Sequence, residues 1–597
     1  MGIPHLTTIL KPYGQPCLLD GRTVVIDGPA LAYHIIYICN RERPATGPIT
    51  HPSCNVLART AIAWLDNLRA HDVVIAAVYF DGYLPLEKRK VRLERFSRTT
   101  RDINNYYLSN PKGPPPPAHA VEASDSIPSL FPKPAAAASS LRLPPSAFAV
   151  QAIIEAIVHS DQYGKLSRLV PQEADPYCAA HVRQAGGTVL TSDSDLVLYD
   201  LGPKGSVAFF RDLEVGRLSG VDGILAVEYA PAALSQRLLL PPRYGMSALG
   251  FELYNGIFAP ARALRDAAEA SAISAVPEEY EAFMQPYRIT PPSFSEECHG
   301  DTWKILRGSD SRISECVLQC HLDPDGIVRD RAAELPAVWM FLPQFYEDWL
   351  RPSAWATSLP LRQIAYGLVQ LVPTAPLETV IEHRRLLSAS SNGTSVPIPS
   401  LPSIRLMCND LLSLLGEVRG KIGNTSLCWS VVSMYYDIIW AARERKESVA
   451  LHVLQRDADS NGRINMTTWS VMHLLAQIQA TCYSLRMIKQ ILDIVTDTAI
   501  QSIPACFLSL REQLTALPAL TEMPSARDLE HLPSRMKDEG ALDLLTELAG
   551  LPEPITFKAR RKTKARKVQK EPNNGDSGHG HSSSSASRNP FAALDGM

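Results

Sequence analysis

The chain has 597 residues, of which 45% are apolar and 20% are charged, and its net charge is −3. These values are ordinary for a globular protein, so any basic surface that binds nucleic acid has to be local. The length predicts two or three domains. No run approaches the roughly 18 uncharged apolar residues that a membrane-spanning helix needs, so the sequence predicts no such helix. Eleven scattered cysteines predict a reducing, intracellular compartment.

The first strong pattern is a buried strand that ends on an acid. In residues 22–38, three consecutive apolar β-formers, Val24 to Ile26, come directly before Asp27. After Gly28 the pattern continues as a helix. The same design follows, because a helix at residues 56–69 leads into a strand at 73–80 that ends at Asp81. Alternating strands and helices predict a parallel sheet, whose ligands bind outside the carboxyl ends of the strands.

A basic helix follows Asp81. Lys88, Arg92 and Arg95 recur at spacings of four and three, so they lie near one face of that helix. The composition then turns to Pro, Ala and Ser at residues 111–145, which predicts a disordered insertion. The fold resumes with a helix at about residue 146.

Residues 171–195 hold two acidic pairs. Glu173 and Asp175 come before a predicted helix, and Asp193 and Asp195 come after a Gly-Gly turn and a short buried strand. Such pairs repel one another unless a cation lies between them. Residues 196–199 and 207–210 are predicted as a strand pair.

Beyond about residue 260 the pattern is mostly helical, with Pro-rich loops and little strand signal. The clearest helix is at residues 467–494, where apolar residues recur every three or four positions, so we expect it to be mostly buried. In residues 558–570, eight of thirteen are Lys or Arg, and a Ser-, Gly- and His-rich tail follows. This run predicts nuclear targeting, phosphate binding or a solubilising end.

The carboxylates at or beside predicted strand ends form one set, namely Asp27, Asp81, Glu173, Asp175, Asp193 and Asp195. Magnesium takes hard oxygen ligands and keeps several waters, so six converging acids predict a site for Mg²⁺ or Mn²⁺. Two such ions about 4 Å apart are the arrangement that cleaves phosphodiesters. The sequence alone leaves open that these acids are solvated loop residues that cap helices and turns.

Several ordered motifs carry a family resemblance. They read MGIPHL, VVIDGPALAY, YFDG with the basic helix after it, EADPYCAA and TSDSD. In this order they resemble the nuclease core of the XPG and flap-endonuclease (PIN-like) superfamily, over roughly residues 1–255. The helical remainder, with its segment MTTWSVMHLLAQIQATCYSLRMIKQIL, resembles the Asteroid branch of that superfamily.

The resemblance implies roles for particular residues. The six acids correspond to the metal ligands of the family, with Asp175 in place of its second Glu. Lys88 and Arg95 match cations that orient the scissile phosphate, Arg92 adds to the nucleic-acid-binding face, and Tyr33 matches an aromatic on which a base stacks. Glu252, in Gly250-Phe251-Glu252, is an imperfect match to the last aspartate of the family.

The resemblance also implies the architecture. We expect a PIN-like α/β nuclease domain with a central, mainly parallel sheet at residues 1–255, a mostly α-helical region at 256–552 and a disordered basic tail at 553–597. The implied activity is two-metal, structure-specific cleavage of DNA or RNA flaps, overhangs or junctions, with a role in DNA repair. Further expectations are a protein partner for the helical region, no membrane association, and a location in the nucleus or in nucleus and cytoplasm.

An alternative reading is a catalytically weakened nuclease fold that serves as a scaffold for nucleic-acid or protein binding, for example in post-transcriptional regulation. The imperfect match at Glu252 favours it. So does the lack of a visible glycine-rich helix-hairpin-helix after that residue, because the family uses this motif to grip duplex backbone.

Two weaker metal patterns have simpler readings. Residues 457–468 match a calcium loop until position twelve, where Thr468 lacks the closing carboxylate, so a polar turn is favoured. Cys298, His299 and His321 could join Cys316 and Cys320 in a zinc site. The spacing is no recognised ligand pattern, and Cys316 and Cys320 fit one buried helix face.

Overall fold

A computed structural model describes residues 3–42, 46–84, 86–116, 126–131, 143–256, 259–288, 300–308, 310–322, 335–372, 374–388, 390, 392–459, 461–498 and 502–557. Much of the predicted insertion at 111–145 therefore lies outside the described residues. The predicted tail lies outside them from residue 558 onward, and with it the basic run at 558–570.

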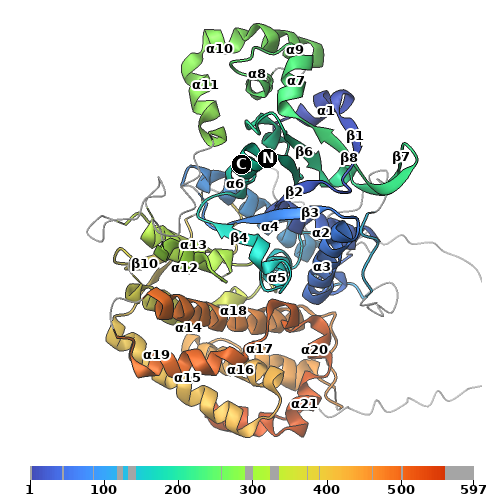
Figure 1. The fold of residues 1–597 in the computed structure, drawn as a ribbon. Helices are drawn as coiled ribbons and strands as arrows, with labels where there is room; N and C mark the ends of the chain where they lie inside the picture. Colours follow the sequence, from blue (N-terminus) through green and yellow to red (C-terminus); the bar gives the residue numbers. More distant parts are fainter. Residues whose placement is uncertain are drawn as a thin grey trace, which may run out of the picture. The chain divides into compact units, whose positions relative to one another are not determined.

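The main sheet confirms the predicted mainly parallel core (Figure 1). Its strands are β1 (Gln15–Leu18), β2 (Thr23–Asp27), β3 (Val74–Asp81), β4 (Ser167–Val170), β5 (Gly187–Thr191), β6 (Gly205–Phe209), β7 (Glu214–Leu218) and β8 (Val221–Tyr229). Their order is β1-β8-β6-β5-β2-β3-β4, with β7 paired to β8. The run from β6 to β4 is parallel, whereas β1, β7 and β8 pair in antiparallel fashion.

The helices of this region lie on both faces of the sheet. They are α1 (Leu6–Leu10), α2 (Gly28–Glu42), α3 (Cys54–Ala70), α4 (Arg89–Ser109), α5 (Ala149–Val158), α6 (Ala174–Ala185), α7 (Pro231–Arg237) and α8 (Met246–Tyr254). Within β2, Val24 and Ile26 pack in the hydrophobic cluster that includes α2, α3 and α5, whereas Val25 packs in the cluster of α6 and α8. Burial on both faces is why β2 reads as a continuous apolar run.

The predicted strand at residues 196–199 is wrong, because Ser194–Leu198 forms a short 3-10 helix. The Asp193 carboxylate accepts a hydrogen bond from the Asp195 amide at 3.0 Å and so caps this turn. Leu196, Val197 and Leu198 are all buried. A 3-10 turn that is enclosed by protein buries consecutive apolar residues, as a buried strand does. The run of apolar residues in the sequence therefore could not distinguish a 3-10 turn from a strand.

The region after β8 and α8 is mostly helical, as predicted. Its helices are α9 (Pro260–Glu269), α10 (Ser271–Ala275), α11 (Pro277–Met284), α12 (Gly300–Leu306), α13 (Ser311–His321), α14 (Leu359–Leu368), α15 (Leu401–Lys421), α16 (Thr425–Glu444), α17 (Val449–His452), α18 (Trp469–Thr498), α19 (Ala505–Gln513), α20 (Ala526–Glu530), α21 (Leu532–Asp538) and α22 (Ala541–Leu548). The long apolar pattern predicted at 467–494 is α18, which packs against α14 and α16 (Figure 1).

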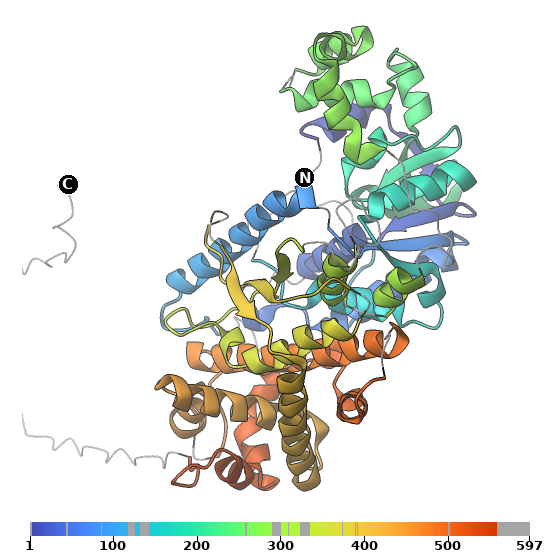
Figure 2. The ribbon, with the colours of Figure 1, turned by 90° about the vertical axis from the view of Figure 1, so that its left-hand side faces the viewer.

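A small second sheet was missed in the sequence. It has the order β11-β10-β9, with β9 (Val338–Phe341), β10 (Thr379–His383) and β11 (Thr394–Pro397). Figure 2 shows this sheet beside α4, where Arg89 lies 4.5 Å above the ring of Trp339. Its strands have only four or five residues, too few to show a clear alternation between faces.

The helical region and the main sheet share one hydrophobic cluster. The cluster runs from α2, α3 and α5 into α14, α16 and α18. Phe148 stacks on Tyr483 of α18 at 5.3 Å between ring centroids, and Glu155 of α5 forms an ion pair with Arg486 of α18. The chain as far as residue 558 forms one compact unit, and the domain border at residue 255 stays a prediction. No helix in the described residues is long and apolar enough to cross a membrane.

Candidate functional site

The predicted acids gather where the strand order of the sheet reverses. From β2 the chain moves outward to β3 and β4, and it then returns to the other side of β2 as β5 and β6. The carboxyl ends of β2 and β5 therefore flank the switch point at which open α/β sheets bind ligands. Asp27 ends β2, and Thr191 at the end of β5 donates its hydroxyl to Asp27 Oδ2 at 2.6 Å.

Glycines let the strand ends approach closely. A Cβ on Gly28 would lie 2.2 Å from the ring of Phe80 and 2.6 Å from the Tyr79 carbonyl oxygen. A Cβ on Gly82 would lie 2.4 Å from the Val170 carbonyl oxygen. Each Asp-Gly pair thus places a carboxylate at a crowded strand end that a larger second residue would push apart.

The pair at the start of α6 is tied to the end of β3. Glu173 is the N-cap residue of α6 and Asp175 lies in its first turn, where the helix dipole favours negative charge. The amide of Ala174 donates to Asp81 Oδ1 at 2.8 Å. Helix α6 therefore delivers two carboxylates to the side of the site that Asp81 occupies.

The acids interact strongly. Burial raises the pKa of Asp27 to about 6, even though the Thr191 hydroxyl opposes this shift. Burial and the nearby Glu173 charge raise the pKa of Asp81 to about 7. The pKa of Asp175 is raised well above its ordinary value by burial and then by the other carboxylates, in the order Asp27, Asp193, Asp81 and Glu173. Five of the six predicted acids therefore face a common space.

The sixth acid, Asp195, is held by other groups. Its Oδ1 accepts from the Ile3 amide at 2.7 Å and its Oδ2 accepts from the Tyr287 hydroxyl at 3.1 Å. Burial and the charge of Asp193 raise its pKa, so Asp195 still borders the cluster. Sequence reasoning missed Thr191 and Tyr287, and no pattern around Tyr287 marks it, because it comes from the short helix Gln285–Tyr287 far along the chain.

Glu252 lies in a different environment. Glu252 is 1% exposed. Its carboxylate accepts a hydrogen bond at 3.2 Å from the amide of Ala272, which lies in the first turn of α10. Burial raises the pKa of Glu252, and the charges that also act on it are those of Asp266 and Arg262 of α9. The structure therefore places Glu252 among α8, α9 and α10, and its role as a metal ligand stays a prediction.

The three predicted cations, Lys88, Arg92 and Arg95, lie in different environments. Lys88 forms an ion pair with Glu173 at the mouth of the cluster. Arg92 is turned toward the helical region, where it pairs with Glu315 at 2.5 Å and lies 4.2 Å above the ring of Phe341. Arg95 is exposed to solvent. Tyr33 is 60% exposed on α2, which leaves its ring accessible to a stacking base.

The different environments of Arg92 and Arg95 give the first testable prediction. Replacing Arg92 with Met is expected to lower the free energy of unfolding by about 1–3 kcal/mol, because the largely buried Glu315 loses its charged partner. Replacing the exposed Arg95 with Met is expected to change it by less than about 0.5 kcal/mol. Urea unfolding of both variants measures the difference, and equal losses would contradict a structural role that is specific to Arg92.

The donor set at the strand ends consists of carboxylates. No group of three or more His, Cys, Asp or Glu side chains among the described residues has the geometry to hold a metal ion as it stands. The chemistry of the set nevertheless fits Mg²⁺ or Mn²⁺, since all five facing groups offer hard carboxylate oxygens. Burial and the charges of the neighbouring carboxylates raise the pKa of Asp175, and a cation among them would reverse this effect.

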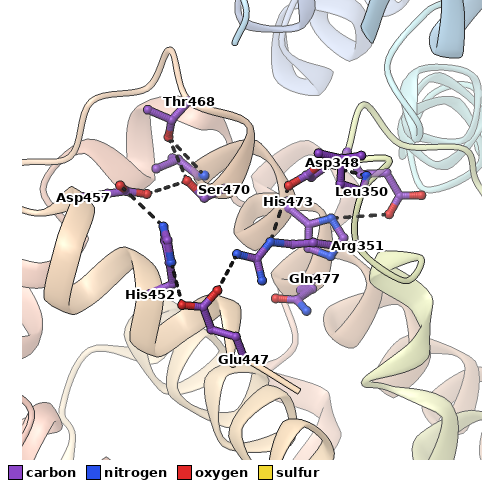
Figure 3. Close-up of polar contacts among 12 residues, drawn as sticks. Asp348, Leu350, Arg351, Glu447, His452, Asp457, Thr468, Ser470, His473 and Gln477 are labelled. Carbon is purple, nitrogen blue, oxygen red and sulfur yellow. Dashed lines mark hydrogen bonds and ion pairs between the residues drawn. The ribbon is translucent and has the colours of Figure 1, made fainter. Parts of the chain in front are cut away.

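The two other metal patterns have structural explanations in the described residues. In the loop that resembles a calcium site, Asp457 accepts from the Ser470 hydroxyl at 2.5 Å (Figure 3), and Asp459 accepts from the backbone amides of Asn461 and Arg463. Cys316 and Cys320 share the buried face of α13. Of the other proposed zinc partners, His321 is buried with its Nε2 3.2 Å from the Thr302 hydroxyl, and Cys298 and His299 lie outside the described residues.

Comparisons with known proteins agree with this fold. A family model described as "XPG domain containing" matches residues 145–398, which include Glu173, Asp175, Asp193 and Asp195. This match and the mainly parallel sheet support a nuclease fold similar to that of the XPG/PIN-like class. The chain is also 23% identical over 212 residues to Asteroid homolog 1 of Schizosaccharomyces pombe, over 34% of this chain and 31% of that relative. Together the two matches support an XPG/PIN-like family of the Asteroid type.

Proposed function

We propose that this chain is a divalent-metal-dependent nuclease that cleaves phosphodiester bonds of DNA or RNA at flaps, overhangs or junctions. The observation that carries the proposal is the buried Asp175 carboxylate at the switch point between β2 and β5, whose pKa is raised by burial and by the charges of Asp27, Asp193, Asp81 and Glu173. Structural acids are normally spaced apart or paired with cations. Burial also raises the pKa values of Asp27 and Asp81, and carboxylates perturbed in this way at such a position are typical of a functional site.

The facing carboxylates, namely Asp27, Asp81, Glu173, Asp175 and Asp193, would hold two Mg²⁺ or Mn²⁺ ions. Bound there, the ions would supply the positive charge that a phosphodiester needs to accept a nucleophile. Lys88 already reaches the cluster through Glu173, and it would exchange this partner for a phosphate oxygen of the substrate. Arg95 would contact the backbone further along α4, and Tyr33 would stack on an unpaired base.

A substrate panel tests the proposal. The purified chain is incubated with flap, overhang and splayed duplexes of DNA and of RNA, with Mg²⁺, with Mn²⁺ or with EDTA. Cleavage is expected only with a divalent ion and only where a single strand meets a duplex. Failure to cleave any substrate with either metal, or equal cleavage in EDTA, would contradict it.

A second candidate function is a nuclease-fold scaffold that binds nucleic acid or protein without cleavage. It is favoured by the engagement of Asp195 with Tyr287 and by the position of Glu252 among α8, α9 and α10. The scaffold predicts binding to the same substrates with no product. The substrate panel therefore separates the two functions when a binding assay is run beside it.

Two further proposals concern the cell. The basic run at residues 558–570 would direct the chain to the nucleus, and fluorescence microscopy of the chain with and without that run tests this. The helical region would supply the surface for a protein partner, in keeping with its separate pattern in the sequence. A role in DNA repair would follow from cleavage of flaps or junctions.

A further inference from the structure

The 3-10 helix Gln285–Tyr287 brings a residue of the helical region to the acid cluster. It follows α11 directly, and α11 packs against α8 and α10. Its last side chain, Tyr287, donates its hydroxyl to Asp195 Oδ2 at 3.1 Å, across 92 positions of the chain. The predicted nuclease domain ends at residue 255. A residue from beyond that border therefore reaches a carboxylate that follows β5.

Aromatic rings fix the position of Tyr287. The ring of Tyr199 meets that of Tyr287 edge-on, with 5.5 Å between the centroids, and the Tyr199 hydroxyl donates to the carbonyl oxygen of Pro286 at 3.1 Å. The ring of Phe283 in α11 lies 5.4 Å from that of Tyr287 and 5.3 Å from that of Phe251 in α8. Edge-to-face and tilted ring pairs at such distances are favourable. Tyr287 is therefore held both by the sheet region and by α8.

The Tyr287 hydroxyl faces the carboxylates of the cluster. Burial raises its pKa, and so do the nearby charges of Asp195, Asp193 and Asp175. The hydroxyl therefore keeps its proton and acts as a donor. Burial and the charge of Asp193 raise the pKa of Asp195, whereas the bonds from the Ile3 amide and the Tyr287 hydroxyl lower it. These bonds favour the ionised carboxylate, which is the form that binds a cation.

The Tyr287 donor carries no charge, unlike the Lys88 ammonium that pairs with Glu173. An ammonium cancels the charge of its carboxylate, whereas a hydroxyl orients a carboxylate and leaves its charge in place. The described residues donate three hydrogen bonds to Asp195, from the Ile3 amide, the Ser194 hydroxyl and the Tyr287 hydroxyl. A carboxylate has about four acceptor positions, so one remains. Hydrogen-bond partners of this kind orient the carboxylates of metal sites.

We propose that Tyr287 is a positioning residue of the metal site. Its hydroxyl holds the Asp195 carboxylate in the orientation in which its charge and its remaining acceptor position serve a divalent ion at the acid cluster. The inference rests on the proposed function, because it needs an ion there. It gives α9–α11 a direct role in the site, which is to carry Tyr287. The opposite reading, in which the hydroxyl blocks Asp195, fits the scaffold function and predicts that loss of the hydroxyl strengthens Mn²⁺ binding.

Calorimetric titration of the full, metal-free chain with MnCl₂ tests the inference. Tyr287→Phe keeps the ring and removes only the hydroxyl. It is expected to weaken Mn²⁺ binding about 10- to 100-fold, as loss of a hydrogen-bond partner of a metal ligand does. Tyr254→Phe is the matched control, because it makes the same change on a residue that is 65% exposed and whose ring lies 5.2 Å from that of Phe283. The control is expected to bind Mn²⁺ as the unmodified chain does.

The results of this titration separate the inference from the proposed function. Unchanged Mn²⁺ affinity in Tyr287→Phe would overturn the inference and leave the proposed function standing. Tighter binding would also overturn the inference, and it would show that the hydroxyl blocks Asp195. No Mn²⁺ binding by the unmodified chain would overturn both.

A double-mutant cycle shows whether Tyr287 acts through Asp195. Asp195→Asn alone is expected to weaken Mn²⁺ binding. Adding Tyr287→Phe to it is expected to cause little further loss, because the hydroxyl then has no charged carboxylate to orient. An equal loss in both backgrounds would show that Tyr287 acts elsewhere and would overturn the inference. A lower melting temperature of Tyr287→Phe in EDTA with unchanged Mn²⁺ affinity would overturn it as well, since a merely structural role has that result.

Discussion

Replacing Asp193 with Asn is expected to lower cleavage of a flap substrate about 10³-fold. The change removes one negative charge from the cluster that would hold the metal ions, and a loss of this size corresponds to about 4 kcal/mol of transition-state stabilisation. The amide oxygen of Asn can still accept the hydrogen bond from the Asp195 backbone, so the 3-10 turn should keep its cap. Single-turnover rates with Mg²⁺ measure the effect.

Asp200→Asn is the matched control for this change. Asp200 is seven residues further along, is exposed, and pairs with Arg183 at 3.2 Å outside the cluster. Its replacement should leave the rate within about twofold of the unmodified chain, as is usual for a surface change away from a site. Equal rates for the unmodified chain and Asp193→Asn would show that the cleavage has another origin.

Replacing Asp175 with Asn is expected to stabilise the metal-free protein and to abolish its stabilisation by Mn²⁺. The pKa of Asp175 is raised, so its ionised form is disfavoured in the folded state, and this cost grows as the pH rises above the unfolded value. At pH 8 in EDTA, removal of the charge should raise the free energy of unfolding by about 1–3 kcal/mol. With Mn²⁺, only the unmodified chain should melt at a higher temperature.

Thermal melts in EDTA and in MnCl₂, with Asp200→Asn as control, measure both effects. A melting temperature that Mn²⁺ raises equally in the unmodified chain and in Asp175→Asn would place the ion elsewhere. No response of the unmodified chain to Mn²⁺ would contradict the metal site itself. A Mn²⁺ response without cleavage would instead favour the scaffold function.

The sequence predicted most of the sheet and its acids because both depend on local patterns. Asp27 and Asp81 follow unbroken apolar runs, and such runs mark parallel strands that are buried on both faces. Sequence reasoning could not predict the contacts that cross the chain. The ion pair of Arg92 with Glu315 joins residues 223 positions apart, and nothing near Arg92 distinguishes it from the exposed Arg95.

Helix α18 shows the same limit in another form. His473 and Gln477 sit in the apolar pattern of α18, where the prediction was a mostly buried helix. That prediction was right, since both side chains are buried. The bond of Gln477 to Asp437 on α16 is a tertiary contact that helical periodicity does not report.

The hydrophobic cluster that joins the sheet region to the helical region has a consequence for experiments. Because α5 and α18 pack in the same cluster, we expect the two regions to melt in one cooperative transition. Any ion or ligand that binds only the folded chain then raises this one melting temperature. Mn²⁺ bound at the acid cluster should therefore shift one melting curve that reports on both regions, although none of its expected ligands lies in the helical region.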